Sequence, residues 1–497
     1  IGHHHGAREH GAGEPGGALA RHLGRDQPFV EEVEGDAGGG LRTERSDLRS
    51  SRRHDRGRDP ALVHVLDGLL HRPLDQRRIA AANQAGPAVV LSFVISGTAC
   101  AFAALAYAEL AATVGGCGSA YGYSYVAFGE IVAWMIGWIL LLEYSVSVAA
   151  VANGWSGYFN NALNAIGFGL PDALTKSPEM GGLINLPAAG IILLLMAMLI
   201  KGAKQSAQLN TAMVFIKLLA IIIFVGVAAF NIHPENWHPF LPYGWFNTLP
   251  DGKTVGVLAG ASLVFFAYVG FDAVSTAVEE AKNPQRDVPI GIIASLTFCT
   301  LIYIIVAGLL TGVVPYTALG VDHPVAFALE SIGYHWASAL VSTGVIAGLT
   351  TVMLVLYYGL TRIILAMSRD GLITPYLSEV NSKTQTPIRV IVLTGFIMAT
   401  AAGLVPLGAL AELVNIGTLA AFVLVCLGVV VLRIKHPDVH RPFKNPYNPV
   451  FPVLGMLSCG ALMAFLPQQT WARFLLWLGL GVVIYFAYSI KHSKLKH

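Results

Sequence analysis

Runs of apolar residues long enough to cross a bilayer recur along this chain from residue 85 to residue 489. A membrane helix needs about 20 such residues to span the ~30 Å hydrocarbon core, and it satisfies its own backbone polar groups. The 497-residue sequence is 54% hydrophobic and only 12% charged, whereas a soluble domain has about 25% charged residues. The chain is therefore predicted to be an all-α polytopic membrane protein.

Eleven spans are expected, joined mostly by short polar connections. They cover residues 85–112, 131–151, 184–200, 209–230, 255–278, 290–314, 337–366, 388–405, 410–432, 450–466 and 474–489. A short surface helix is predicted at residues 324–330, because Pro324 suits the first turn of a helix. The five cysteines show no paired spacing, so neither a disulfide framework nor a metal site is indicated, and no cofactor is expected.

Lysine and arginine gather on alternate connections between these spans. The rich side carries Lys201, Lys204, Lys282, Arg286, Arg369, Lys383, Arg389, Arg433, Lys435, Arg441, Lys444, Lys491, Lys494 and Lys496. By the positive-inside rule this side is cytoplasmic, which makes residues 490–497 a basic cytoplasmic tail. The span at 85–112 then starts outside. One more helix before it would return the N-terminus to the cytoplasm and make twelve.

Residues 1–84 differ from the rest of the chain. Residues 1–78 contain thirteen arginines, eight histidines and no lysine, and the first lysine of the sequence is Lys176. Such a composition arises when GC-rich DNA is read in an unintended frame, and it is also typical of a disordered basic tail. We expect the first interpretation, with residues 85–489 forming the transmembrane domain.

Residues 265–290 carry the strongest functional signal, because Asp272 and Gly270 lie within an otherwise apolar run. A carboxylate at membrane depth costs about 2.5 to 3.5 kcal/mol on insertion scales, so such residues usually mark a functional site. Glycine allows the backbone to leave helical geometry, and a bilayer tolerates that only where the break lines protein or a cavity. This combination predicts a substrate site at a broken helix.

Residues 85–489 resemble the cationic amino acid transporter branch of the amino acid, polyamine and organocation permeases. The matching words are AGPAVVLSFVISG at 85–97, AALAYAELA at 103–111, GSAYGYSYVAFGE at 118–130, GWILLLEY at 137–144, NGWSGYF at 153–159, FFAYVGFDAVSTAVEEAKNPQRDVPIGI at 265–292 and AMSRDGLI at 366–373. They follow the order expected for that family. The family's first helix has a glycine-rich break, and nothing in residues 1–84 resembles it.

The resemblance implies an inverted-repeat fold of five plus five helices, with two more at the end. The first and sixth helices are then broken near the bilayer midplane, where half-helix ends face the substrate. Backbone groups around Ala267, Tyr268 and Gly270 would face the amino and carboxyl ends of the substrate, and Phe266 would close over it from outside. Without the first broken helix, transport is expected to be severely reduced.

Two further ionisable residues lie inside predicted spans. The resemblance places Glu143 beside the side-chain end of the substrate, and the alternative is a protonated acid bonded to a neighbouring helix. Lys217 lies about 12 Å along its span, and the resemblance places it where sodium-coupled relatives hold a cation. A buried lysine loses its proton readily, so Lys217 is predicted to couple transport to protons. A structural ion pair or a lysine that snorkels to the interface is the alternative.

Three other residues have an ordinary interpretation beside the functional one. Asp272 fits either the substrate site or a helix cap. Met353 resembles a pocket-lining position, although a lone methionine in an apolar span is often packing filler. Glu109 lies near the end of a predicted span, which is typical of a residue at the membrane–water interface.

The expected function is a secondary active transporter that moves amino acids across the plasma membrane by alternating access, coupled to protons. Its partners are the amino acid, protons and the lipid bilayer, with no nucleic acid. An exchanger without proton coupling or an inactive truncated permease is the alternative. Clustered catalytic groups and a filter-like segment, which would indicate an enzyme or a channel, are not evident. Cationic and small neutral substrates, and the oligomeric state, stay open.

Overall fold

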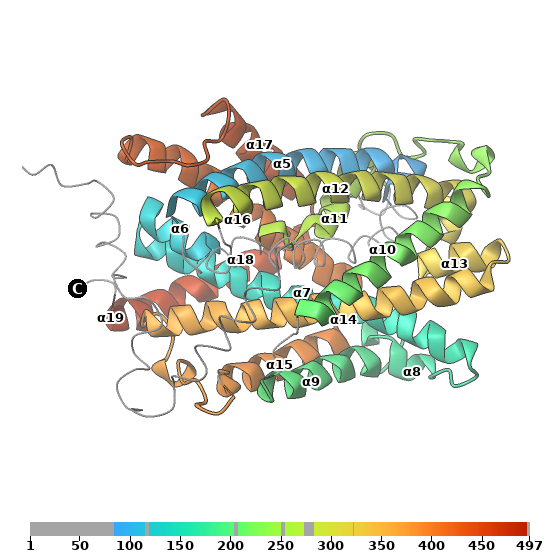
Figure 1. The fold of residues 1–497 in the computed structure, drawn as a ribbon, viewed down its shortest axis with the longest axis horizontal. Helices are drawn as coiled ribbons and strands as arrows, with labels where there is room; N and C mark the ends of the chain where they lie inside the picture. Colours follow the sequence, from blue (N-terminus) through green and yellow to red (C-terminus); the bar gives the residue numbers. More distant parts are fainter. Residues whose placement is uncertain are drawn as a thin grey trace, which may run out of the picture.

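The computed structural model describes residues 84–114, 119–202, 207–249, 254–272, 283–321, 323–384 and 386–494. The prediction for the N-terminal segment therefore lies almost wholly outside the described residues, as do residues 273–278 of the predicted span 255–278. The described chain forms an elongated bundle in which most helices run along the long axis (Figure 1).

The described elements are nearly all helical. The α-helices are α5 (Val89–Val114), α6 (Ser119–Phe128), α7 (Glu130–Ala165), α8 (Asp172–Thr175), α9 (Leu186–Ile200), α10 (Ala207–Ala229), α11 (Val257–Val264), α12 (Pro284–Val313), α13 (Pro324–Ser331), α14 (His335–Arg369), α15 (Ile388–Leu404), α16 (Leu407–Lys435), α17 (Val450–Ala464), α18 (Gln468–Ile484) and α19 (Ile490–His492). Short 3₁₀ turns are η3 (Gly86–Ala88), η4 (Pro178–Met180), η5 (Pro234–Trp237), η6 (Phe265–Tyr268), η8 (Tyr316–Ala318) and η9 (Pro375–Leu377), and η10 (Tyr485–Ser489) is a π-helical turn. Strands β1 (Asn247–Thr248) and β2 (Thr254–Val255) pair antiparallel in a small hairpin.

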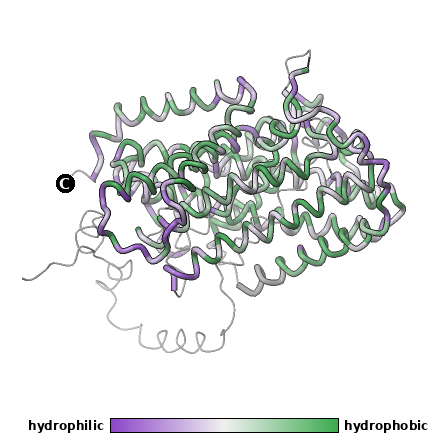
Figure 2. Tube along the Cα trace, turned by 90° about the horizontal axis from the view of Figure 1, so that it is seen from above, coloured by the Kyte–Doolittle hydropathy of each residue, from purple (hydrophilic) through white to green (hydrophobic). Residues whose placement is uncertain are grey.

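The predicted spans agree with the helices of the structure. Within the described residues, six helical stretches are long and apolar enough to cross a membrane, and five shorter ones are also apolar. Each predicted span overlaps one of them. Figure 2 shows that hydrophilic residues gather mainly in the connections at the ends of the bundle. The prediction of a multi-pass helical membrane protein is confirmed.

Two helix groups form the interior. Helix α7 packs against α14, α16, α9 and α15, while α5 packs against α12, α11 and α17. Helix α16 contacts both groups, since it packs against α7 and α5. The helices that come to the centre therefore belong to segments far apart in the sequence.

The short helix predicted at residues 324–330 is present as α13, with Pro324 in its first turn. Its expected position on the surface is wrong. Pro324, Val325, Ala326, Ala328 and Leu329 are buried, and α13 packs against α14. The reason is that the six consecutive residues 324–329 are all apolar and surround the helix, which packs against α14, α10 and α12.

The predicted break at Gly270 is confirmed. Helix α11 ends at Val264, the turn η6 follows, and Val269 then leaves helical geometry with φ −59° and ψ 127°. Gly270 has φ +112°, a conformation that L-residues rarely adopt. The predicted span at 255–278 is thus not one continuous helix.

We expect Gly270→Ala to lower the free energy of unfolding by about 1 to 3 kcal/mol, because the new residue would be held in an unfavourable conformation. An added Cβ meets no atom within 4 Å there, so strain alone produces the effect. Thermal unfolding of the purified protein in detergent measures it. Gly460→Ala is the matched control, since that glycine lies in α17 with equally open space. Equal midpoints for the two variants would contradict the interpretation.

Candidate functional site

The broken segment lies deep inside the bundle, where Phe266, Ala267, Tyr268 and Gly270 are all buried. Asp272 is only 1% exposed, and its Oδ1 atom accepts a hydrogen bond of 3.1 Å from the Gly270 amide. The carboxyl group therefore satisfies a backbone donor that the break removed from the helical ladder. This contact gives Asp272 a structural role in the break, beside the role predicted for it in the site.

Hydrogen bonds with α12, α16 and α5 hold the break and the end of α11 in place. Tyr303 of α12 donates to the Ala267 carbonyl at 3.0 Å, and Asn415 of α16 donates to the Ser262 carbonyl at 2.7 Å. The Tyr268 hydroxyl donates to the Phe93 carbonyl of α5 at 2.8 Å. The side chain of Tyr268 therefore anchors the break to α5, and the Ala267 carbonyl already has one partner.

Sequence reasoning missed Tyr303 and Asn415. The polar amide of Asn415 inside the predicted span 410–432 was the one available signal. No signal in the sequence pointed to Tyr303, because it is one of 17 tyrosines. Its partner, the Ala267 carbonyl, depends on how α12 packs on the break.

Lys217 lies on α10 and is 1% exposed. Its Nζ atom donates to Thr351 Oγ1 of α14 at 2.7 Å, and the Thr351 hydroxyl donates to the Gly348 carbonyl at 2.7 Å. The alternative of a snorkelling lysine is therefore wrong, because the ammonium group is enclosed between two helices. Met353, which is fully buried, lies two residues further along α14.

Glu143 of α7 is also buried. Tyr107 of α5 packs edge-on against Phe271, the residue before Asp272, with ring centroids 6.0 Å apart. Asp272 thus lies next to the part of the break that α5 contacts, whereas Lys217 is tied to α14. Tyr107 lies in the word AALAYAELA but was not predicted as a site residue.

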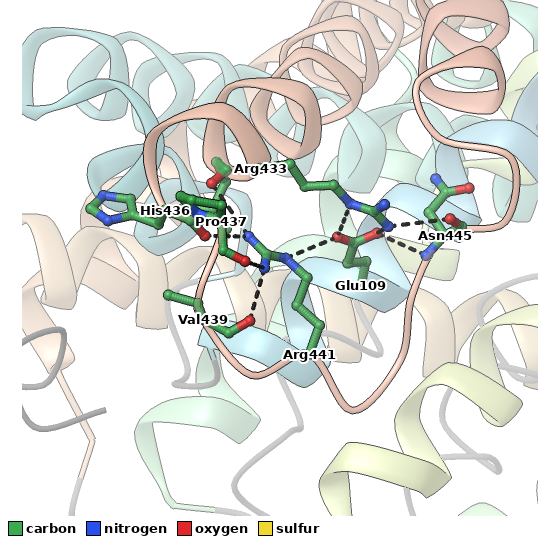
Figure 3. Close-up of polar contacts among 8 residues, drawn as sticks. Glu109, Arg433, His436, Pro437, Val439, Arg441 and Asn445 are labelled. Carbon is green, nitrogen blue, oxygen red and sulfur yellow. Dashed lines mark hydrogen bonds and ion pairs between the residues drawn. The ribbon is translucent and has the colours of Figure 1, made fainter. Parts of the chain in front are cut away.

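A second buried charged cluster centres on Glu109, near the C-terminal end of α5 (Figure 3). Arg433 of α16 binds it in a bidentate pair, with Nε to Oε1 at 2.8 Å and Nη2 to Oε2 at 2.6 Å. The Asn445 amide donates to Oε2 at 2.8 Å, and Arg441 Nε lies 3.4 Å from Oε1. The interfacial interpretation of Glu109 is wrong. The side chain is 1% exposed, because the segment that follows α16 folds back over it.

Arg441 also closes the C-terminal end of α16. Its guanidinium donates to the carbonyls of His436 and Val439 at 2.8 Å each, and to the Leu432 carbonyl at 3.3 Å (Figure 3). A positive group there meets the unsatisfied carbonyls and the negative end of the helix dipole. The cluster therefore joins α5, α16 and the connection to α17 into one rigid corner.

We expect Glu109→Gln to destabilise the protein by about 3 kcal/mol, because the substitution leaves two arginines beside a neutral group. The destabilisation is expected to come from the lost charge of the carboxylate and not from a change in side-chain volume. Thermal unfolding in detergent is the measurement, with Glu179→Gln as the control at an exposed position of η4. A midpoint for Glu109→Gln that matches the control would show that the cluster contributes nothing to stability.

The comparisons with known proteins agree with this architecture. Residues 77–487 match the amino acid permease family. The chain belongs to that family. It is 48% identical to "Branched-chain amino acid permease BcaP" of Bacillus subtilis, over 83% of this chain and 88% of the relative. It is 46% identical to the "Methylthioribose transporter" of the same organism, over 84% and 88%. It is 38% identical to "Cationic amino acid transporter 4" of Mus musculus, over 83% of each chain.

These relatives are named as permeases and transporters, and the cationic amino acid transporter among them supports the branch that the sequence motifs indicated. The prediction of an amino acid permease is confirmed at the level of the family. The break at Val269 and Gly270 is accordingly a feature of a transporter fold, in the segment where the permease resemblance implied a substrate site.

Proposed function

We propose that this permease is a secondary active transporter that carries amino acids across the plasma membrane around a site at the broken segment 265–272. The observation that carries the proposal is the break itself. A non-helical backbone with a buried carboxyl group occurs within an apolar bundle whose family transports amino acids. Membrane proteins tolerate such a break where it is enclosed by protein or lines a cavity.

In this proposal the fold is an inverted repeat of five plus five helices followed by two more. Helix α11 with η6 is then the sixth helix of the twelve, and the backbone of Ala267, Tyr268 and Gly270 faces the substrate. Phe266 closes over the substrate from outside. In this proposal residues 490–497 lie in the cytoplasm.

The substrate is proposed to be an amino acid with a neutral or cationic side chain. Glu143 favours a positive group at the side-chain end, and Met353 adds an apolar contact. The names of the relatives span branched-chain and cationic amino acids, which agrees with a site that has both an acidic and an apolar wall.

Proton coupling is assigned to Lys217. Its ammonium group lies between α10 and α14 with Thr351 as a partner, so a change of its charge would alter how these two helices pack. A proton gained or lost at this buried group during the transport cycle would therefore change the contact with Thr351.

The function is tested with purified protein in liposomes by uptake of radiolabelled leucine, alanine and lysine. Saturable accumulation that follows an imposed proton gradient is expected. Uptake that requires amino acid inside the liposomes, and ignores the gradient, would favour an exchanger. Non-saturable flux would favour a channel, and no flux of any amino acid would indicate an inactive protein.

We expect Lys217→Ala to abolish accumulation driven by a proton gradient, because the variant has no group to protonate between α10 and α14. Exchange of internal for external substrate should persist, since it needs no net proton movement. Lys383→Ala, at an exposed position in the connection before α15, is the control. Proton-driven accumulation by Lys217→Ala at the wild-type level would remove this lysine from the coupling mechanism.

We expect Asp272→Asn to weaken substrate binding about tenfold, which corresponds to the loss of one charge-assisted hydrogen bond. The amide oxygen of asparagine can still accept from Gly270, so the break should persist. Binding is measured by isothermal titration in detergent, with Asp172→Asn on the exposed helix α8 as the control. Unchanged affinity would show that Asp272 acts only as a cap within the break.

A further inference from the structure

The connection that follows α10 crosses the end of the bundle opposite α19 (Figure 1). We call residues 232–246 of this connection the strap, and the turn η5 lies within it. Groups of the strap bond to the ends of three helices, α5, α11 and α12. The strap therefore does more than connect α10 to α11.

The strap caps the C-terminal end of α12. The His233 amide and the Asn236 Nδ2 atom both donate to the Gly312 carbonyl, at 3.0 and 2.9 Å. The last four carbonyls of an α-helix have no partner within the helix, and that of Gly312 is one of them. Trp237 Nε1 donates to the Gly308 carbonyl at 3.3 Å. The Trp237 ring packs where a glycine leaves room, since a Cβ added at Gly312 would lie 2.8 Å from its Cζ2 atom.

The strap also caps the N-terminal ends of α5 and α11. The Phe240 carbonyl accepts from the amide of Ala88, which directly precedes α5, at 3.1 Å. The Trp245 carbonyl accepts from the amide of Leu258, in the first turn of α11, at 3.1 Å. First-turn amides have no partner within their own helix. One segment thus satisfies backbone groups at the ends of three helices.

Helix α11 also lies close along α5. The hydroxyls of Ser92 and Ser96 donate to the carbonyls of Val257 and Ala261, at 2.8 and 2.6 Å. A Cβ added at Gly260 would lie 2.7 Å from Ser92 Oγ, so the two helices approach closely. Because α11 has only eight residues, or about 12 Å of length, and the break follows it, its position depends on these contacts and on the strap.

We propose that the strap is a clamp that positions the broken segment. It holds the outer end of α11 against α5 and α12, and it stays in place throughout the transport cycle instead of opening as a lid. The proposal rests on the proposed function, in which the strap lies on the outer side of the membrane. It assigns Asn236 and Trp237 as positioning residues, which act on the break through α12 and α11.

A disulfide between the strap and α12 separates a clamp from a lid. A Cβ added at Gly312 would lie 3.2 Å from Ile232 Cγ2, and the Cβ atoms of a disulfide are about 3.5 to 4.5 Å apart. The double variant Ile232→Cys with Gly312→Cys is therefore oxidised in liposomes with copper phenanthroline. We expect it to take up radiolabelled leucine, alanine or lysine within twofold of the same sample after reduction. A lid locked shut would stop uptake until the disulfide is reduced.

Three controls belong to this experiment. Each single variant controls for crowding, because a side chain at position 312 also meets Trp237. The wild type under the same oxidant controls for native cysteines, of which four are buried and free: Cys100, Cys299, Cys426 and Cys459. Mass spectrometry gives the fraction of the double variant that is cross-linked.

Loosening the strap tests its positioning role. Trp237→Ala removes the ring and the bond to Gly308, so fewer molecules hold α11 in the competent position, and the apparent affinity falls by that fraction. We expect the half-saturation concentration to rise about fivefold, as for loss of one hydrogen bond, with the maximal rate unchanged. Trp237→Phe keeps a ring beside Gly312 and should show a smaller rise. Trp336→Ala, at an exposed position of α14, should show none.

Two results would overturn the clamp. One is uptake that stops in the oxidised double variant and returns on reduction, which would identify the strap as a lid. The other is a wild-type half-saturation concentration for Trp237→Ala, and this measurement decides the question where the double variant does not fold. Wild-type protein that takes up none of the three amino acids would instead refute the proposed function itself, so the two failures are distinguishable.

Discussion

The satisfaction of backbone polar groups without water is the constraint on which the rest of this structure depends. An α-helix meets it internally, but after Val264 the chain passes through the 3₁₀ turn η6 and leaves helical geometry at Val269. Each unsatisfied amide or carbonyl in an apolar medium costs several kcal/mol. The break is therefore possible only where other parts of the fold supply partners, and that requirement places it at the centre of the bundle.

The partners of the break come from separate segments. Asp272 accepts from the Gly270 amide, Tyr303 of α12 donates to the Ala267 carbonyl, and Tyr268 reaches the backbone of α5. These contacts fix the break in relation to the helices that surround it. Rigid support of this kind is what a binding site requires.

Two buried carboxyl groups of the bundle have different partners. Glu109 has a bidentate arginine, a second arginine and a backbone amide as partners. Such complete pairing makes a fixed corner, because the charge is compensated in every direction. Asp272 instead accepts a hydrogen bond from the Gly270 amide inside the break. The first arrangement joins three segments of the fold, and the second stabilises the interrupted backbone.

The sequence by itself determined the class of the protein, its spans and the position of the break. Apolar length decides whether a segment enters a bilayer, and a glycine beside an aspartate marks where a helix is interrupted; both are local properties. The sequence also indicated Asp272, Glu143 and Lys217, because a charged residue inside an apolar run can be recognised before the fold is known. Only the tertiary structure decided that Glu109 is buried, that Thr351 meets Lys217 and that Tyr107 packs against Phe271 of the break. Those facts depend on which helices pack together, and helices distant in sequence supply the partners.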